Sequence, residues 1–122
     1  AARCPAPLPL APGGNVRIGR AVQSASFWEA LVPDRVLRGA VSREQFDVIS
    51  DVSGNGPVQR RRLIVFNRSS GGSLLNGTAV SGYAEAQLGD VIAVPRPKEA
   101  GEGPPIAQFI LEGGGGAQRL AG

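Results

Sequence analysis

The sequence of 122 residues contains no histidine, no methionine, one cysteine and one lysine. Without histidine, the chain has no Ser-His-Asp or Cys-His nucleophile system and no histidine-ligated zinc site. The single Cys4 excludes an internal disulfide and is typical of a reducing, intracellular compartment. Lys98 is not part of a Gly-Lys-Ser/Thr phosphate loop. We therefore expect a non-enzymatic protein without metal or cofactor, located in the cytoplasm or the nucleus.

Long apolar runs are also missing. No stretch approaches the roughly 18 apolar residues that a membrane span needs, so we expect no membrane partner. Eighteen glycines and ten prolines indicate many short strands separated by turns, in place of long helices. Because the chain lacks a methionine to start it, we expect it to be one part of a longer protein.

Short apolar segments recur between turn residues along most of the chain. They predict strands at 16–18, 46–49, 63–66, 91–94 and 106–111, with a hairpin across 46–67. A second hairpin is predicted across 74–80, because its Asn76-Gly77 pair suits a type I′ turn, in which both central residues have positive φ. Turn signals about every 8–12 residues between short strands favour a β-sandwich.

One segment departs from this strand pattern. Ser26, followed three residues later by Glu29, fits a capping box at the start of a helix. Pro33 then ends the helix, because proline cannot continue the backbone hydrogen bonds. We therefore predict a short helical insertion around residues 27–32, in which Trp28 covers one end of the core.

The two ends of the chain differ from its middle. Residues 1–14 form a Pro-rich arm, which we expect to be an edge strand or to stay loose, because proline cannot donate a hydrogen bond within a sheet. The Gly-rich residues 113–122 are predicted to be a flexible tail. A single domain over 15–112 remains between them.

Four motifs follow one another in this domain. They are Ile18-Gly19-Arg20, Val41-Ser42-Arg43-Glu44-Gln45-Phe46, the run from Asn67 to Gly77, and Leu88-Gly89-Asp90-Val91-Ile92. Their order over about residues 16–111 resembles the forkhead-associated (FHA) family. The pattern of that family is Gly-Arg, Ser-Arg-x-His-Phe, Ser-Ser/Thr-Asn-Gly-Thr-x-x-Asn-Gly and Leu-x-x-Gly-Asp-x-Ile. The resemblance implies an all-β fold, an eleven-stranded FHA-type β-sandwich, whose loops at one end hold a phosphothreonine peptide without catalysis.

The resemblance also implies a role for each motif residue. Arg20 holds the peptide backbone and lies near the phosphate, and the hydroxyl of Ser42 bonds the phosphate. Arg43 adds positive charge, and Ser70 shapes the pocket. Gly71 stands where the family has an asparagine that grips the peptide main chain. Because glycine has no side chain, those hydrogen bonds are lost, and affinity falls several-fold to tenfold at about 1 kcal/mol per neutral hydrogen bond.

Four further motif residues are implied to be architectural. Gly19, Asn76 and Gly77 fix turns beneath the loops. Gln45 stands where the family has a histidine that braces the loops, and its amide supplies both a donor and an acceptor. We therefore expect this exchange to be tolerated.

The expected partner is a phosphothreonine-containing protein or peptide, bound by a module of a larger signalling or scaffold protein. A phosphothreonine brings about −1.5 to −2 charge and three acceptor oxygens. Two or three charge-assisted hydrogen bonds at about 1.5–3 kcal/mol each support micromolar affinity. Arginine suits this ligand because its planar fork matches phosphate, and the chain has twelve arginines.

Other functions stay open. The changes at Gln45 and Gly71 and the inserted helix also fit a divergent FHA-like domain that has lost phosphopeptide binding and acts as a constitutive docking or oligomerisation scaffold. The arginines leave nucleic-acid binding open, but a net charge of +3 is small, and we do not expect a nucleic-acid partner. A parent enzyme such as a kinase, targeted by this domain, is the remaining alternative.

Overall fold

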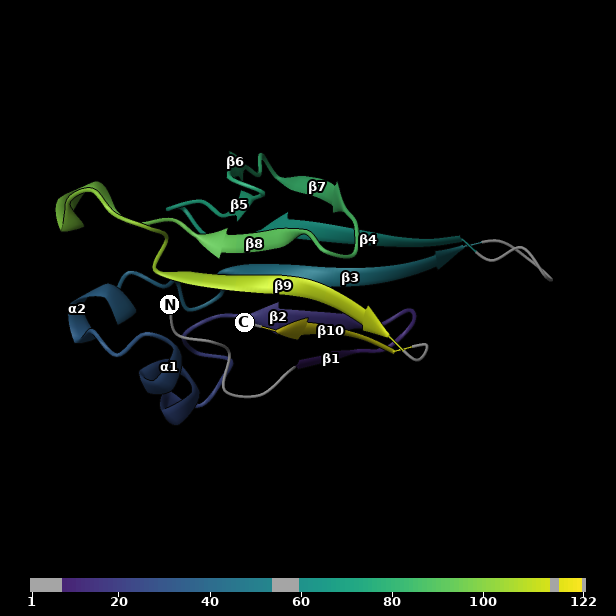
Figure 1. The fold of residues 1–122 in the computed structure, drawn as a ribbon, viewed down its shortest axis with the longest axis horizontal. Helices are drawn as coiled ribbons and strands as arrows, with labels where there is room; N and C mark the ends of the chain where they lie inside the picture. The colour runs from purple at the N-terminus through teal and green to yellow at the C-terminus, as the bar shows by residue number, and fades with distance from the viewer. Residues whose placement is uncertain (1–7, 54–59, 115–116, 122) are drawn as a thin grey trace.

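The structure, a computed structural model, describes residues 8–53, 60–114 and 117–121 (Figure 1). It contains two antiparallel sheets. The six-stranded sheet contains, in spatial order, β1 (Leu8–Leu10), β10 (Ala117–Ala121), β9 (Ala107–Gly114), β8 (Val91–Val94), β5 (Leu74–Leu75) and β6 (Thr78–Ala79). The four-stranded sheet contains β2 (Asn15–Ile18), β3 (Phe46–Ser53), β4 (Arg60–Asn67) and β7 (Tyr83–Ala86).

The hydrophobic core lies between the two sheets. Phe46 on β3 and Phe109 on β9 are fully buried, and their ring centroids lie 5.7 Å apart in an edge-to-face contact. Trp28 from the inserted helix packs against Phe109, with the ring centroids 6.5 Å apart. The predicted all-β sandwich is therefore confirmed, as is the burial of Trp28 at the core. The described part of the chain has ten strands, whereas the family resemblance implied eleven.

Each strand predicted from the sequence is present, as β2, β3, β4, β5, β6, β8 and β9. At the β5–β6 turn, Asn76 has φ 50° and Gly77 has φ 83°, which confirms positive φ at both central positions. The turn of the hairpin predicted across 46–67 lies outside the described residues. The sequence does not predict β7, because its Tyr-Ala-Glu-Ala sequence has only one large apolar side chain.

The inserted helix α1 (Ala25–Leu31) begins two residues earlier than predicted. Its N-cap is Ser24, whose Oγ accepts a hydrogen bond from the backbone N–H of Phe27 at 3.2 Å. Ser26 therefore lies inside the first turn, and the predicted capping box is wrong. Both serines have a side chain that can cap, and only the folded chain decides which of them leaves the helical backbone conformation.

Two short helical turns were not predicted. Helix α2 (Arg35–Arg38) begins at Asp34, whose Oδ1 accepts hydrogen bonds from the N–H groups of Val36 and Leu37 at 2.9 and 3.1 Å. The 3₁₀ helix η1 (Lys98–Ala100) lies between β8 and β9. None of the helices in the described ranges is long and apolar enough to cross a membrane.

The chain ends join the six-stranded sheet. Within the predicted arm, β1 is an edge strand and pairs with β10, so an edge strand is confirmed for Leu8–Leu10. The prediction of a flexible tail is wrong for Ala117–Ala121, because β10 pairs with β9 in an antiparallel register. Leu120 lies opposite Leu111, and both side chains are buried in the core. The burial of Leu120 explains why the chain continues past its glycines into the sheet.

Asp47 is a buried carboxylate on the outer face of the four-stranded sheet. Its neighbours Phe46 and Val48 both point into the core, which places Asp47 on the opposite face. Arg17 Nε donates to Asp47 Oδ1 at 2.8 Å, and Arg68 Nε donates to Oδ2 at 2.5 Å. Burial alone would raise the pKa of the Asp47 carboxyl, but the two arginines outweigh it and hold that pKa below its ordinary value.

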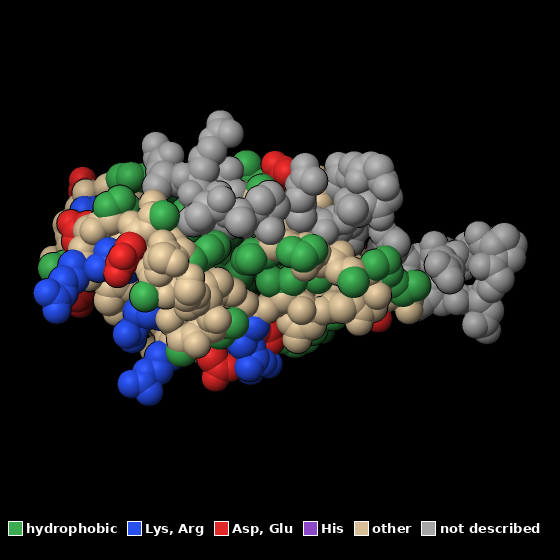
Figure 2. All heavy atoms as spheres, turned by 90° about the horizontal axis from the view of Figure 1, so that it is seen from below, with side chains coloured by type: hydrophobic (Ala, Val, Ile, Leu, Met, Phe, Trp, Pro, Cys, Tyr) green, Lys and Arg blue, Asp and Glu red, His purple; other side chains and the backbone are tan. Residues whose placement is uncertain are grey.

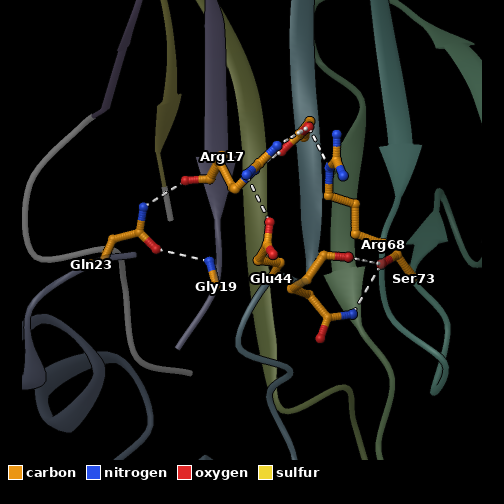
Figure 3. A network of polar contacts seen from close by, with 8 residues as sticks. Arg17, Gly19, Gln23, Glu44, Arg68 and Ser73 are labelled. Carbon is orange, nitrogen blue, oxygen red and sulfur yellow. Dashed lines mark hydrogen bonds and ion pairs between the residues drawn. The ribbon is translucent and has the colours of Figure 1, made fainter. Parts of the chain in front are cut away.

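Arg17 carries a second partner. Figure 3 shows Glu44 beside Arg17, and the Nη1–Oε2 distance is 2.7 Å. Arg17 on β2 thus joins the outer face of the sheet to the segment that leads into β3. The carboxylates of Glu44 and Asp47 are both engaged by Arg17, which leaves Arg43 without them.

We predict that Asp47→Asn lowers the free energy of unfolding by about 1.5–3 kcal/mol at neutral pH, because two charge-assisted hydrogen bonds become neutral ones. The pKa of the Asp47 carboxyl is lower in the folded state than its unfolded-state value of about 4. Its ionised form therefore stabilises the fold above about pH 4, and this stabilisation is lost as the pH falls through the folded-state pKa. The variant should therefore lose less stability than the wild type on acidification below about pH 4. Urea unfolding over a pH series measures both effects.

The matched control is Asp51→Asn. Asp51 pairs with Arg62 at 3.8 Å, and both side chains are about half exposed, so its loss should cost less than about 1 kcal/mol. If the free energy of unfolding fell equally for Asp47→Asn and the wild type below about pH 4, Asp47 would not be the group that causes the acid-induced loss of stability.

Candidate functional site

The predicted site residues come from loops at one end of the sandwich. Segments 19–24, 39–45, 67–73 and 95–105 connect strands there, and we call these four segments the loop end. Figure 1 shows α1, α2 and the β8–β9 connection at this same end. At the opposite end, the end of β3 pairs with the start of β4, with Ser53 opposite Arg60. The positions of the strand ends thus bring together motifs that are far apart in the sequence.

Gly19 and Arg20 lie directly against the second motif. The backbone N–H of Arg20 donates to the carbonyl of Ser42 at 2.9 Å, and its side-chain Nε donates to the carbonyl of Val41 at 3.0 Å. A Cβ on residue 19 would lie 2.0 Å from the carbonyl oxygen of Arg43. Glycine is therefore required at position 19 by this close backbone approach.

Two side chains fix the Gly19 turn from the other side. Figure 3 shows Gln23 between Arg17 and Gly19: its Oε1 accepts from the Gly19 N–H at 2.9 Å, and its Nε2 donates to the Arg17 carbonyl at 2.7 Å. The indole N–H of buried Trp28 donates to the Gly19 carbonyl at 3.0 Å. The inserted helix is thereby tied to the turn that carries Arg20.

Gln45 links the second and third loops from beneath. Its side chain is almost fully buried, and its Oε1 accepts from the Ser42 N–H at 3.0 Å. Its Nε2 donates to the Gly72 carbonyl at 2.7 Å and to Ser73 Oγ at 3.0 Å. The amide thus supplies the donor and the acceptor that the sequence anticipated at this position.

The hydroxyls of Ser42 and Ser69 form a pair that joins the same two loops. Their Oγ atoms lie 2.6 Å apart, so one of the two hydroxyl protons is used within the pair. Ser69 Oγ also accepts a hydrogen bond from the N–H of Gly71 at 3.1 Å. This bond uses neither of the two hydroxyl protons. The second hydroxyl proton has no acceptor among the described residues. The pair can therefore donate one hydrogen bond to a ligand.

Asn67 holds the third loop in shape. Its Oδ1 accepts from the Ser69 N–H at 3.1 Å and from Ser73 Oγ at 2.9 Å, and its Nδ2 donates to the Ser69 carbonyl at 3.0 Å. Sequence reasoning quoted Asn67, Ser69 and Ser73 within the third motif but assigned no role to them. The side-chain amide at 67 and the hydroxyls at 69 and 73, which are spaced by even numbers of residues, are the signal that could have pointed to them.

The predicted residues are not all brought together. Ser70 is exposed and makes no hydrogen bond within the described ranges, while Ser69, one residue earlier, contacts Ser42. Gly71 is exposed in the same loop. Asn76, in the β5–β6 turn, bonds through its backbone and side chain to Val91 on β8. Asn76 therefore supports a turn outside the loop end.

The charges divide into two groups. Among the arginines whose side chains the structure describes, Arg17, Arg62 and Arg68 form ion pairs on the four-stranded sheet. The others have no carboxylate partner in the described ranges and lie in the loop end or on α2: Arg20, Arg35, Arg38, Arg43 and Arg96. Figure 2 shows most of the visible Lys and Arg side chains toward one end of the molecule, with Asp and Glu side chains among them. The loop end is thus positively charged.

A hollow of about 330 Å³ lies beside the hydroxyl pair. Ser69 and Gly71 line one side of it, and Arg96, Lys98 and Glu99 from the β8–β9 connection line another. Sequence reasoning missed Arg96 and Lys98, because no motif includes them and only the fold brings the connection to this end. Two cationic side chains and one carboxylate thus share this space with the Ser69 hydroxyl, so its lining carries a net positive charge.

Comparison of the chain with protein-family models, with curated proteins and with solved structures finds no match. No group of three or more His, Cys, Asp or Glu side chains in the described ranges could hold a metal ion. The donors at the loop end are the Ser42–Ser69 hydroxyl pair and the guanidinium groups of the neighbouring arginines, and such donors favour an anionic ligand.

We predict that Gly19→Ala destabilises the fold by at least about 1–3 kcal/mol, because the added Cβ collides with the Arg43 backbone and forces two loops apart. Thermal unfolding of the variant measures the effect. Gly39→Ala is the matched control: its φ is −64° and its Cβ would lie 3.4 Å from the nearest atom, so stability should change by less than about 1 kcal/mol. Equal stability of the two variants would show that the Gly19 contact is not a constraint.

Proposed function

We propose that this protein is a non-enzymatic interaction module that binds a phosphothreonine-containing segment of a partner protein. One observation carries the proposal. The Ser42–Ser69 pair keeps one hydroxyl proton for a ligand. Arg43, in the same segment as Ser42, and Arg20, in the adjoining segment 19–24, have no carboxylate partner among the described residues. A phosphate offers the negative charge and the acceptor oxygens that such a set of donors lacks.

The ligand would be held by groups that are already in place. The Arg20 Nε is fixed on the Val41 carbonyl, which leaves its two Nη groups to donate to phosphate or to a peptide carbonyl. The hydroxyl pair would donate to a second phosphate oxygen. Loops that are fixed on a rigid sandwich need little rearrangement, so less binding free energy is lost to ordering. The preference for phosphothreonine over phosphoserine rests on the FHA resemblance.

A constitutive docking function is the second candidate. It is supported by an apolar groove of about 590 Å³ between the inserted segment and the six-stranded sheet. Leu31, Val32 and Leu37 line one wall, and Ile106 and Ile110 line the other. A partner that used this groove would need no phosphate.

Titration with a phosphothreonine peptide library and its unphosphorylated twin separates the two functions. We predict micromolar binding of the phosphorylated library alone. Ser42→Ala and Ser69→Ala should each weaken it by about tenfold or more, because a hydrogen bond to a charged group contributes about 1.5–3 kcal/mol. Isothermal titration calorimetry measures these affinities.

Two further variants sharpen this test. Ser70→Ala should cost less affinity than Ser69→Ala, since Ser69 and not Ser70 contacts Ser42. Thr78→Ala removes an exposed hydroxyl outside the loop end and should leave the affinity within about twofold. If both libraries bind equally and Leu37→Asp abolishes binding, the docking function through the apolar groove replaces the phosphothreonine proposal.

A further inference from the structure

A second hollow lies on the other side of the loop end. It encloses about 300 Å³ between α1, α2 and the turn at 19–20, and we call it the arginine pocket. Arg20, Arg35 and Arg38 line it, together with Trp28 and Glu29. The Ser42–Ser69 pair does not line it. The pocket is built largely from the inserted segment, which the four sequence motifs do not include.

The guanidinium groups in the arginine pocket are not neutralised. Arg38 Nη1 donates to the carbonyls of Val32 and Pro33, each at 3.1 Å, and both acceptors are uncharged. The nearest carboxylate in the sequence, Asp34, is occupied as the N-cap of α2. Arg35 is exposed and has no side-chain partner in the described ranges. Three cationic groups therefore line this space against one carboxylate.

The arginine pocket is joined rigidly to the proposed phosphothreonine site. The indole N–H of Trp28, which forms part of the pocket, donates to Gly19 at 3.0 Å. Arg20 follows in the chain, and its Nε is held by the Val41 carbonyl. Because Arg20 lines the pocket and also stands beside the Ser42 loop, a single peptide that crosses Arg20 reaches both places.

The size and chemistry of the pocket define its ligand. A volume of about 300 Å³ is at the lower end of the range for ligand cavities, so it suits one side chain in place of a nucleotide or a large cofactor. Arginine forks bind phosphate and carboxylate in a bidentate manner. The aromatic wall formed by Trp28 keeps water away on one side, which strengthens electrostatic attraction.

We propose that the arginine pocket is a second anionic subsite. It binds a phosphorylated or acidic side chain of the same peptide whose phosphothreonine meets the Ser42–Ser69 pair. This inference rests on the proposed function and adds to it a specificity for targets that carry two anionic groups. Glu29 is the single carboxylate among the lining residues, and its charge opposes the binding of an anion there.

The test compares three sets of peptides on the whole chain. One set carries phosphothreonine alone, one adds a glutamate at each flanking position in turn, and one adds a phosphoserine at each flanking position in turn. At the matching position we expect the phosphoserine peptide to bind about tenfold more tightly than the singly phosphorylated one, and the glutamate peptide to gain less. The tenfold gain corresponds to about 1.4 kcal/mol.

Arg35→Ala should remove this gain and leave the affinity for the singly phosphorylated peptide unchanged, because Arg35 lies outside the hydroxyl pair. Arg62→Ala removes the same charge from the four-stranded sheet and is the matched control, in which the gain should persist. Glu29→Gln should increase the gain, since it removes the single opposing charge of the pocket.

The possible outcomes separate this inference from the proposed function. Binding of singly phosphorylated peptides with no gain at any flanking position, or a gain that survives Arg35→Ala, overturns the subsite and leaves the proposed function standing. No binding of any phosphopeptide overturns both. A further outcome is that a DNA duplex or vesicles with anionic lipids bind more tightly than any of the phosphopeptides and lose this binding in Arg35→Ala. That result assigns the pocket to a different ligand and overturns the peptide subsite.

Discussion

Gln45 connects the core of the sandwich to the loops, and the arrangement of the site depends on its hydrogen bonds. Its backbone N–H donates to Ile18 at 2.7 Å, and its carbonyl accepts from Arg68 at 3.0 Å. Its side-chain amide holds Ser42 and Gly72. Because this residue is about 1% exposed, an unpaired amide there would be costly. The two loops that carry the hydroxyl pair are therefore held in a fixed position relative to each other.

The distribution of charge then determines which kind of ligand these fixed loops favour. On the four-stranded sheet, Asp47 neutralises Arg17 and Arg68 within a hydrogen-bonded cluster. At the loop end, Arg20 and Arg43 have no such partner within the described part of the chain. The arginines around Asp47 thus stabilise the fold, while Arg20 and Arg43 are the ones that the proposed function assigns to a ligand. Under that proposal, an anionic partner would complete the hydrogen bonding of the loop end.

The sequence predicts the features that local rules control. Strand alternation and the Asn76-Gly77 turn correctly predicted both hairpins. The contact of Ser69 in place of Ser70 depends on how one loop meets another, which no local pattern encodes. The tail was mispredicted because its glycines suggested flexibility, while the pairing of Leu120 with β9 is a tertiary contact. The arginine pocket was missed for the same reason, since α2 is too short to show a helical period.

The most direct test of this account is an NMR titration of the isotope-labelled protein with one phosphothreonine peptide and its unphosphorylated twin. The account predicts that backbone amide shifts occur with the phosphorylated peptide alone and cluster in segments 19–24, 39–45 and 67–73. Shifts that are the same for both peptides, or that map to the apolar groove or to the outer face of the four-stranded sheet, would contradict it. The first result would show binding that does not depend on phosphate, and the second would place the binding surface elsewhere.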